Sequence, residues 1–192
     1  MHLDAMDSPK GEVTRLLHAA RDGDATAMDR IIHLVYDDLC AIAARQLRRE
    51  PFQRTTQPAS LVHEAYMKLA NGAALHAGDR AHFLALAGRA MRQVLVEHAR
   101  RRSAAKRRPM ELASLGDDVW ATPVSPEEIL TLNDAIDQLE PRQRQVVECR
   151  FFGGLEEREI AATLGVDERT VRRDWVKARA WLYQALYGAA SA

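Results

Sequence analysis

The sequence contains few of the residues that build disulfide-bonded or membrane-spanning proteins. It has only two cysteines, Cys40 and Cys149, and their separation matches no metal-binding or redox motif. We expect both to be buried thiols in a reducing compartment. No stretch approaches the roughly 18 consecutive apolar residues of a membrane-spanning helix, and the first ten residues lack the apolar core of a signal peptide. These absences predict a cytoplasmic protein that makes no membrane contact.

Other absences exclude most kinds of catalysis. The sequence has no glycine-rich phosphate-binding loop. The pair His63-Glu64 has no second histidine four residues after the first, so it does not form the zinc-binding helix motif. The other histidines are scattered along the chain. We therefore expect no enzyme, no catalytic residue, no metal and no cofactor.

Patterns typical of β-strands are nearly absent, and apolar residues recur at helical spacing instead. We expect an all-α protein with two small helical domains, residues 10–108 and 126–188. Residues 109–125, which contain two prolines and one glycine and show no periodicity, are expected to form a flexible linker. The expected helices cover about residues 11–21, 25–49, 58–70, 79 into the basic segment, 125–139 and 140–153, followed by two more before residue 188.

Positive and negative charges are equal in number but unevenly distributed. The 27 basic and 27 acidic residues cancel. However, residues 89–108 contain eight cations and a single acid, Glu97, whereas residues 111–140 contain eight acids and no Lys or Arg. Such segregation creates strong local fields. It favours a nucleic-acid partner over a merely solvated helix face.

The most informative segment, residues 156–182, has the pattern of two helices joined by a tight turn. Gly165 stands where the first helix must end, because glycine adopts the left-handed backbone conformation at low cost. Asp167 is a favourable cap for the second helix. One face of that helix is apolar and the opposite face cationic: Val171, Trp175, Ala178 and Leu182 on the first, Arg169, Arg173 and Lys177 on the second, with Thr170 and Arg172 at its flanks. This is the helix-turn-helix layout, whose second helix fits the DNA major groove; the alternative is a helical hairpin with a solvated basic face.

Three segments together resemble bacterial sigma factors of the extracytoplasmic-function group. Residues 132–182 look like the region that reads the −35 promoter element. Residues 60–70, SLVHEAYMKLA, are similar to the helix that docks on the polymerase clamp, and residues 79–102 are similar to the part that melts and reads the −10 element. The motif LVHEAY at residues 61–66 indicates a subgroup distinct from members that carry LVQE. The resemblance implies core RNA polymerase, through its clamp region, and promoter DNA as partners.

The resemblance also implies roles for individual residues. The expected −35 contacts are Arg169, Thr170, Arg172, Arg173 and Lys177; the expected −10 contacts are His76, Asp79, Arg80, His82, Arg89, Arg92 and Gln93; and the expected polymerase contacts are His63, Glu64 and Lys68. Arg89, Arg92 and Gln93 are expected on an exposed helix face, where they can follow the non-template strand. Phe83 could stack on a base, but its helical spacing favours the core.

One departure from the family pattern suggests regulation. Many members place an acidic cluster just before the docking helix, but residues 54–60 contain no acid. Thr55 and Thr56 are therefore candidate phosphorylation sites, since phosphate supplies negative charge near a helix N-terminus. A Ser/Thr kinase and an anti-sigma factor are candidate further partners. The alternative is that both threonines are only loop and cap residues.

Two other functions stay open. The first is a helix-turn-helix transcriptional regulator whose N-terminal domain senses a ligand or dimerises. The second is a helical adaptor that binds protein and not DNA, which the basic segment 89–108 disfavours. Binding to core RNA polymerase, followed by promoter-specific transcription, distinguishes the sigma factor from both.

Overall fold

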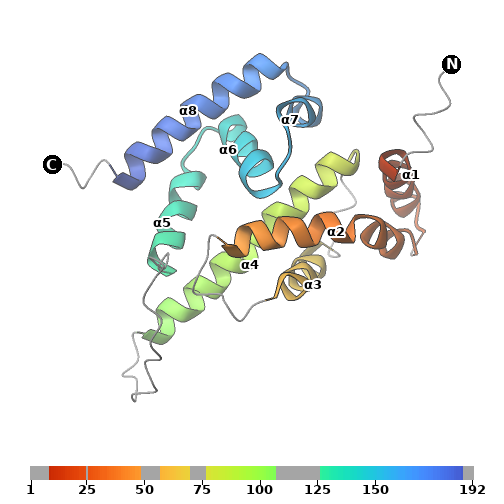
Figure 1. The fold of residues 1–192 in the computed structure, drawn as a ribbon, viewed down its shortest axis with the longest axis horizontal. Helices are drawn as coiled ribbons and strands as arrows, with labels where there is room; N and C mark the ends of the chain where they lie inside the picture. The colour runs from red at the N-terminus through yellow and green to blue at the C-terminus, as the bar shows by residue number, and fades with distance from the viewer. Residues whose placement is uncertain (1–8, 25, 49–56, 70–76, 107–125, 188–192) are drawn as a thin grey trace.

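The computed structural model describes residues 9–24, 26–48, 57–69, 77–106 and 126–187, and within these ranges all regular structure is helical. The all-α prediction is therefore confirmed (Figure 1). None of the described helices is long and apolar enough to cross a membrane. The helices are α1 (Pro9–Arg21), α2 (Ala27–Arg48), α3 (Pro58–Leu69), α4 (Arg80–Lys106), α5 (Pro126–Asp137), α6 (Pro141–Val147), the π-helical turn η3 (Glu148–Phe152), α7 (Glu157–Leu164) and α8 (Glu168–Tyr187).

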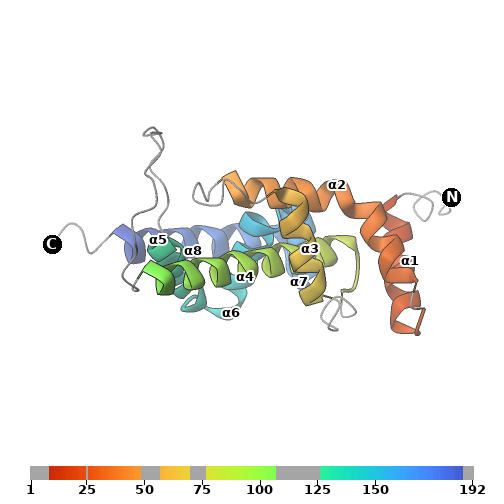
Figure 2. The same cartoon turned by 90° about the horizontal axis from the view of Figure 1, so that it is seen from below.

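The first half of the chain packs around the long helix α4. Helices α2 and α3 lie against α4 and against each other, and α1 crosses the end of α2 (Figures 1 and 2). Apolar residues of α2 recur every three or four positions, so one stripe of the helix faces this core. Fully buried side chains come from every helix of this half: Leu17, Ile31, Leu61, Phe83 and Met91. Phe83 thus belongs to the core, as its spacing indicated.

Helix α4 begins where the sequence predicted but extends further than its apolar pattern. The Asp79 carboxylate accepts a hydrogen bond of 2.8 Å from the His82 backbone N–H, which makes Asp79 the expected N-cap. The helix then continues through the basic segment to Lys106. Arginine, alanine and lysine are good helix formers, so this segment stays helical without an apolar stripe.

The second half contains a π-helical turn that the sequence pattern did not predict. We expected one regular helix from residue 140 to residue 153, but α6 ends at Val147 and η3 follows. The Gly153 N–H donates to the Glu148 carbonyl at 2.9 Å, a bond that spans five residues instead of four. Gly154 then has a φ of 71°, which turns the chain toward α7. The extra residue widens the helix where it meets α4.

The two halves share one apolar core. Val146, Ile160 and Val171 of the second half belong to the same buried cluster as the side chains of α1 to α4. Helix α5 lies along α4, where Ile129 packs with Val96 and Ala99. The expected linker, residues 109–125, lies outside the described residues. The two halves therefore pack against each other through residues that the structure describes.

The two cysteines differ in their environment. Cys149 is buried, as expected, and burial raises the pKa of its thiol to about 11, with a further contribution from the charge of Glu148. Cys40 is only half-buried, so the expectation that both thiols are buried is wrong for this one. Its side chain sits on α2, at the edge of the stripe that faces the core. Neither cysteine forms a disulfide bond.

Replacing Ile160 by alanine is expected to lower the free energy of unfolding by about 2–5 kcal/mol, because it leaves a cavity in the shared core. Ile160 is fully buried. The control is Val176→Ala, whose side chain is 60% exposed and whose loss should change stability by less than about 0.5 kcal/mol. Urea unfolding followed by circular dichroism measures both variants. Equal stability of the two would mean that Ile160 does not support the core.

Candidate nucleic-acid interface

Helices α7 and α8 form the helix-turn-helix that the sequence predicted. At the start of α7, Glu156 and Glu159 form a reciprocal capping box, in which the Glu156 N–H donates to the Glu159 carboxylate at 3.1 Å. Helix α7 ends at Gly165, whose φ of 66° and ψ of 34° are left-handed, as predicted. Ile160 is buried and Leu164 half-buried against the core. These contacts fix the turn between the two helices.

Asp167 caps α8, as predicted. Its carboxylate accepts the Thr170 backbone N–H at 2.7 Å and the Thr170 hydroxyl at 3.2 Å. The backbone hydrogen bond is the main cause that lowers the pKa of Asp167 below its ordinary value of 3.8. Thr170 is thereby held at the start of α8. The cap fixes the angle at which this helix leaves the turn.

Helix α8 has a buried and an exposed face, divided as the sequence predicted. Val171 and Ala178 are fully buried, while Trp175 and Leu182 are half-buried against the same surface. The opposite face is exposed and carries three cations in consecutive turns: Arg169, Arg173 and Lys177. The Arg173 side chain is 57% exposed. Cations at this spacing suit the major groove, where arginine and lysine contact base edges and phosphates.

Arg172 ties α8 to α7. Its guanidinium donates to the Glu157 carboxylate at 2.9 Å, and Arg150 of η3 donates to the same carboxylate at 3.0 Å. These bonds, that from Arg172 foremost, lower the pKa of Glu157. The Arg150 guanidinium also lies 4.9 Å from the centre of the Trp175 ring. Arg172 thus sets the position of α8, which agrees with its predicted place at the flank.

Replacing Asp167 by alanine is expected to lower the urea midpoint of unfolding at neutral pH, because α8 loses its cap. The pKa of Asp167 is lower in the folded protein than its ordinary value. The stabilisation is therefore complete above that ordinary value and disappears as pH falls through the folded pKa. Asp167→Asn, which caps without charge, should keep most of the stability at neutral pH. If Asp167→Ala and the wild type unfold at the same midpoint at neutral pH, the carboxylate is not a stabilising cap.

The residues predicted for the −10 element begin at the N-terminus of α4. Asp79 is occupied as the helix cap. Arg80 forms an ion pair with Asp38 of α2, and the His82 Nδ1 accepts the Gly78 N–H at 3.2 Å. His76 lies outside the described residues. Arg80 thus holds α4 to α2, and His82 holds the residues just before α4; the sequence did not predict either role.

The three residues predicted for the exposed face of α4 do not share one environment. Gln93 is exposed and the Arg89 side chain is 50% exposed. The expectation that Arg92 is exposed is wrong: Arg92 is only 7% exposed, because α5 and η3 cover it. Its guanidinium donates to Asn133 at 2.8 Å and to Glu148 at 3.1 Å. Burial lowers the pKa of Arg92, while the charges of Glu148 and Asp137 raise it. In this arrangement Arg92 cannot reach DNA.

The helix predicted to dock on polymerase, α3, exposes only part of its predicted surface. His63 is exposed. Glu64 contacts the His98 ring at 2.9 Å, and Lys68 donates to Glu97 at 2.6 Å, so both side chains also bind α3 to α4. Met67 is 58% exposed and was missed; its signal was an apolar residue four positions after His63, on the same face. Thr55 and Thr56 lie outside the described residues.

The chain matches one protein-family model and is similar to a solved structure. The family model described as "ECF sigma factor" matches residues 10–188, which include both halves of the chain. One solved structure that the chain is similar to is the sigma factor RpoE in complex with the anti-sigma factor NepR from Bartonella quintana. The sequence identity is 18%, the match covers 84% of this chain and 98% of that one, and the TM-score is 0.40. The search of curated proteins gives no match.

Proposed function

This chain belongs to the ECF sigma factor family, and we propose that it binds core RNA polymerase and directs initiation at promoters with two recognition elements. The observation that carries the proposal is the family match over residues 10–188, because it includes both halves and not the helix-turn-helix alone. Such a protein directs the polymerase to specific promoter sequences and performs no covalent chemistry. Its place of action would be the cytoplasm, where bacterial polymerase works.

We propose that α8 enters the major groove of the −35 element. Arg169, Arg173 and Lys177 project from its exposed face, where arginine pairs with guanine through two hydrogen bonds. Thr170 and Arg172 set the register, since Asp167 and Glu157 already hold them in place.

For the −10 element we propose contacts along α4 and the segment before it. Single-stranded bases are read by stacking and edge contacts, and the backbone is followed by cations. Arg89 and Gln93 are accessible for this in the free protein. Asp79, Arg80 and His82 lie at the helix start, and His76 precedes it. Arg92 joins them only if η3 moves away from α4.

The polymerase contact that we propose is the outer face of α3, including His63, Glu64, Lys68 and Met67. Its first turn contains no acid, and residues 54–60 contain none either. Phosphate on Thr55 or Thr56, added by a Ser/Thr kinase, would supply the missing charge. The LVHEAY wording of α3 would then mark a subgroup regulated in this way. An anti-sigma factor remains a prediction from the family resemblance.

Reconstituted transcription tests the proposal. Purified protein, unmodified and phosphorylated by a kinase, is mixed with core RNA polymerase and promoter DNA selected by the complex. Run-off transcripts from one start site are the expected result. A regulator of the alternative kind would bind DNA but would not replace a sigma factor on core polymerase, and an adaptor would do neither. Absence of promoter-specific transcripts from all forms would refute the proposal.

A further inference from the structure

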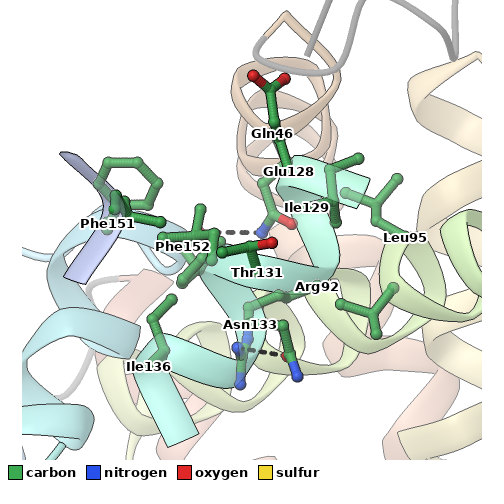
Figure 3. Close-up of a pocket in the computed structure, with 13 residues that line it drawn as sticks. Gln46, Arg92, Leu95, Glu128, Ile129, Thr131, Asn133, Ile136, Phe151 and Phe152 are labelled. Carbon is green, nitrogen blue, oxygen red and sulfur yellow. Dashed lines mark hydrogen bonds between the residues drawn. The ribbon is translucent and has the colours of Figure 1, made fainter. Parts of the chain in front are cut away.

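A cavity of about 490 Å³ lies beside the π-helical turn η3, between α4, α5 and α8 (Figure 3). Most of its lining is apolar and comes from all four elements: Leu95 of α4, Ile129 and Ile136 of α5, Phe152 of η3 and Leu186 of α8. Binding sites for small molecules are typically cavities of about 300–1,000 Å³ with an apolar lining and a few polar groups. The volume and the lining of this cavity therefore suit a small organic molecule.

The π-helical turn forms an aromatic wall of the cavity. Phe151 and Phe152 are consecutive in the sequence, and both line the cavity. Their ring centres are 5.1 Å apart and their planes meet at 72°, an edge-to-face arrangement. Two rings in this arrangement offer a flat apolar ligand both a face and an edge to pack against. Turns of this kind are also frequent at functional sites.

The Gln46 side chain gives the cavity a polar group that lacks one hydrogen bond. Gln46 lines the cavity and is only 3% exposed. Its Nε2 donates to the Gly88 carbonyl at 3.0 Å and to the Phe152 carbonyl at 3.3 Å. These two acceptors fix the orientation of the amide, because a flipped amide would place its oxygen against two carbonyl oxygens. The Gln46 Oε1 therefore stays an acceptor, and it has no hydrogen-bond partner among the described residues.

An unpaired buried acceptor favours a ligand that carries a hydrogen-bond donor. Leaving such an oxygen without a partner costs free energy, which a donor on the ligand would recover. The Gln46 Oε1 is covered in the free protein. Side chains at the cavity would therefore have to shift slightly for the donor to reach it, a kind of rearrangement that is common on binding.

The charges around the cavity favour an uncharged ligand. Arg92 is the one cation among the described residues that line it. The Arg92 guanidinium already donates to the Asn133 side chain at 2.8 Å and to the Glu148 carboxylate at 3.1 Å (Figure 3 shows the bond to Asn133). Glu128 adds an acid to the lining. An anionic ligand would lose its hydration here without gaining an unpaired positive charge.

We propose that this cavity is a binding site for an uncharged, largely apolar small molecule that has an aromatic ring and an N–H or O–H donor. The donor binds the Gln46 Oε1, and the ring packs between Ile129 and the two phenylalanines of η3. The residues proposed to read the −35 element do not line the cavity. The site therefore stands independently of the role of α8 in binding DNA.

Three small aromatic probes of similar size test the ligand chemistry on the full chain. Indole has one N–H donor, benzofuran has the same shape without a donor, and benzoate is an anion. In NMR spectra of isotopically labelled protein, indole should cause saturable shifts of the amide signals of Leu95, Ile129 and Phe152. Benzofuran should bind about threefold to tenfold more weakly, because it lacks the hydrogen bond to a buried acceptor. Benzoate should not shift these signals.

A pair of tryptophan variants tests the location of the site. Leu186→Trp places a larger side chain in the cavity from the last turn of α8, and it should weaken indole binding about tenfold or more. The matched control is Ala185→Trp at the preceding position, which is exposed and does not line the cavity; it should bind indole like the wild type. If Leu186→Trp loses helix content in circular dichroism, Leu132→Phe fills the cavity from α5 instead.

Thermal unfolding supplies a second measurement. Indole should raise the melting temperature of the wild type and of Ala185→Trp but not that of Leu186→Trp, since a ligand stabilises the folded protein that binds it. The inference is wrong if indole gives no saturable shifts at the cavity, or if the cavity-filling variants bind it as tightly as the wild type. Equal binding of indole and benzofuran would overturn the proposed ligand class, because Gln46 would then recognise no donor.

Discussion

Replacing Thr55 and Thr56 together by alanine is expected to abolish activation of the cognate promoter in cells and to leave the fold intact. Residues 54–60 contain no acid, and neither does the first turn of α3, which begins at Pro58. A phosphate would add about 1.5 to 2 negative charges shortly before this helix in the sequence, and a helix N-terminus favours negative charge. Without it, the proposed polymerase-binding surface would lack the negative charge that the family resemblance leads us to expect there.

The measurement is the affinity of core RNA polymerase for the wild type, the phosphorylated protein and the double alanine variant. Thr56 is the preferred site, since it lies nearer the start of α3. Thr56→Glu should rescue only partly, because a carboxylate has less charge than phosphate and no tetrahedral geometry. Circular dichroism of the double variant serves as the folding control. If all three proteins bind polymerase equally, the threonines are loop residues and no switch exists.

Replacing Arg173 by alanine is expected to weaken binding to the cognate −35 sequence by about 1–3 kcal/mol, the value of a bidentate contact to one base. The Arg173 side chain is 57% exposed, and its ion-pair distance to Asp174 is 3.8 Å. This long ion pair competes only weakly with a contact to DNA. The loss should be selective: DNA with a changed −35 element should bind the variant and the wild type alike.

The control for this change is Arg179→Ala, which also removes an exposed cation of α8. Arg179 follows Arg172 by seven positions, so it lies on the flank and not on the outward face. Its loss should affect all DNA sequences weakly and equally. Fluorescence anisotropy with cognate and altered duplexes, at one fixed salt concentration, compares the variants. An equal loss on all sequences for Arg173→Ala would reduce Arg173 to a phosphate contact.

The helix-turn-helix was predictable because its signals are local. A left-handed turn needs glycine, a helix start needs an acceptor side chain, and both stand in the sequence as Gly165 and Asp167. The apolar spacing of α8 then fixes which of its residues point outward. Each of these inferences depends on residues within a few positions of one another, and the structure confirms the turn, the cap and the two faces.

The environment of Arg92 was not predictable in the same way, because its partners are 41 and 56 positions away in the sequence. A weaker signal was present. Val94, Leu95 and Val96 are consecutive and all buried, although an amphipathic helix with one buried face would expose at least one of them. Such a triplet indicates that α4 is covered on more than one side. It does not reveal which helix supplies the cover.

The ion pairs of α3 illustrate the same limit. Sequence spacing places His63 and Glu64 on neighbouring faces of one helix, but it cannot show that Glu64 reaches His98, a residue of α4. Polar side chains on a helix surface can face solvent, a partner or another helix with the same spacing. Candidate polymerase contacts could therefore be named from sequence, whereas their engagement in the free protein required the structure.

The π-helical turn η3 places an unusual constraint on how this chain can evolve. A turn of this kind amounts to one residue inserted into a regular helix. Each residue of an α-helix advances the chain by about 100°, so loss of a single codon between Glu148 and Phe152 would rotate all that follows relative to all that precedes. Substitutions in this segment change one contact, but a change in its length would alter the position of the Phe152–Gly153 backbone, which faces Gly88 of α4, relative to Glu148, which binds Arg92. Homologous proteins that keep the contact between η3 and α4 should therefore keep the length of this segment even where its residues differ.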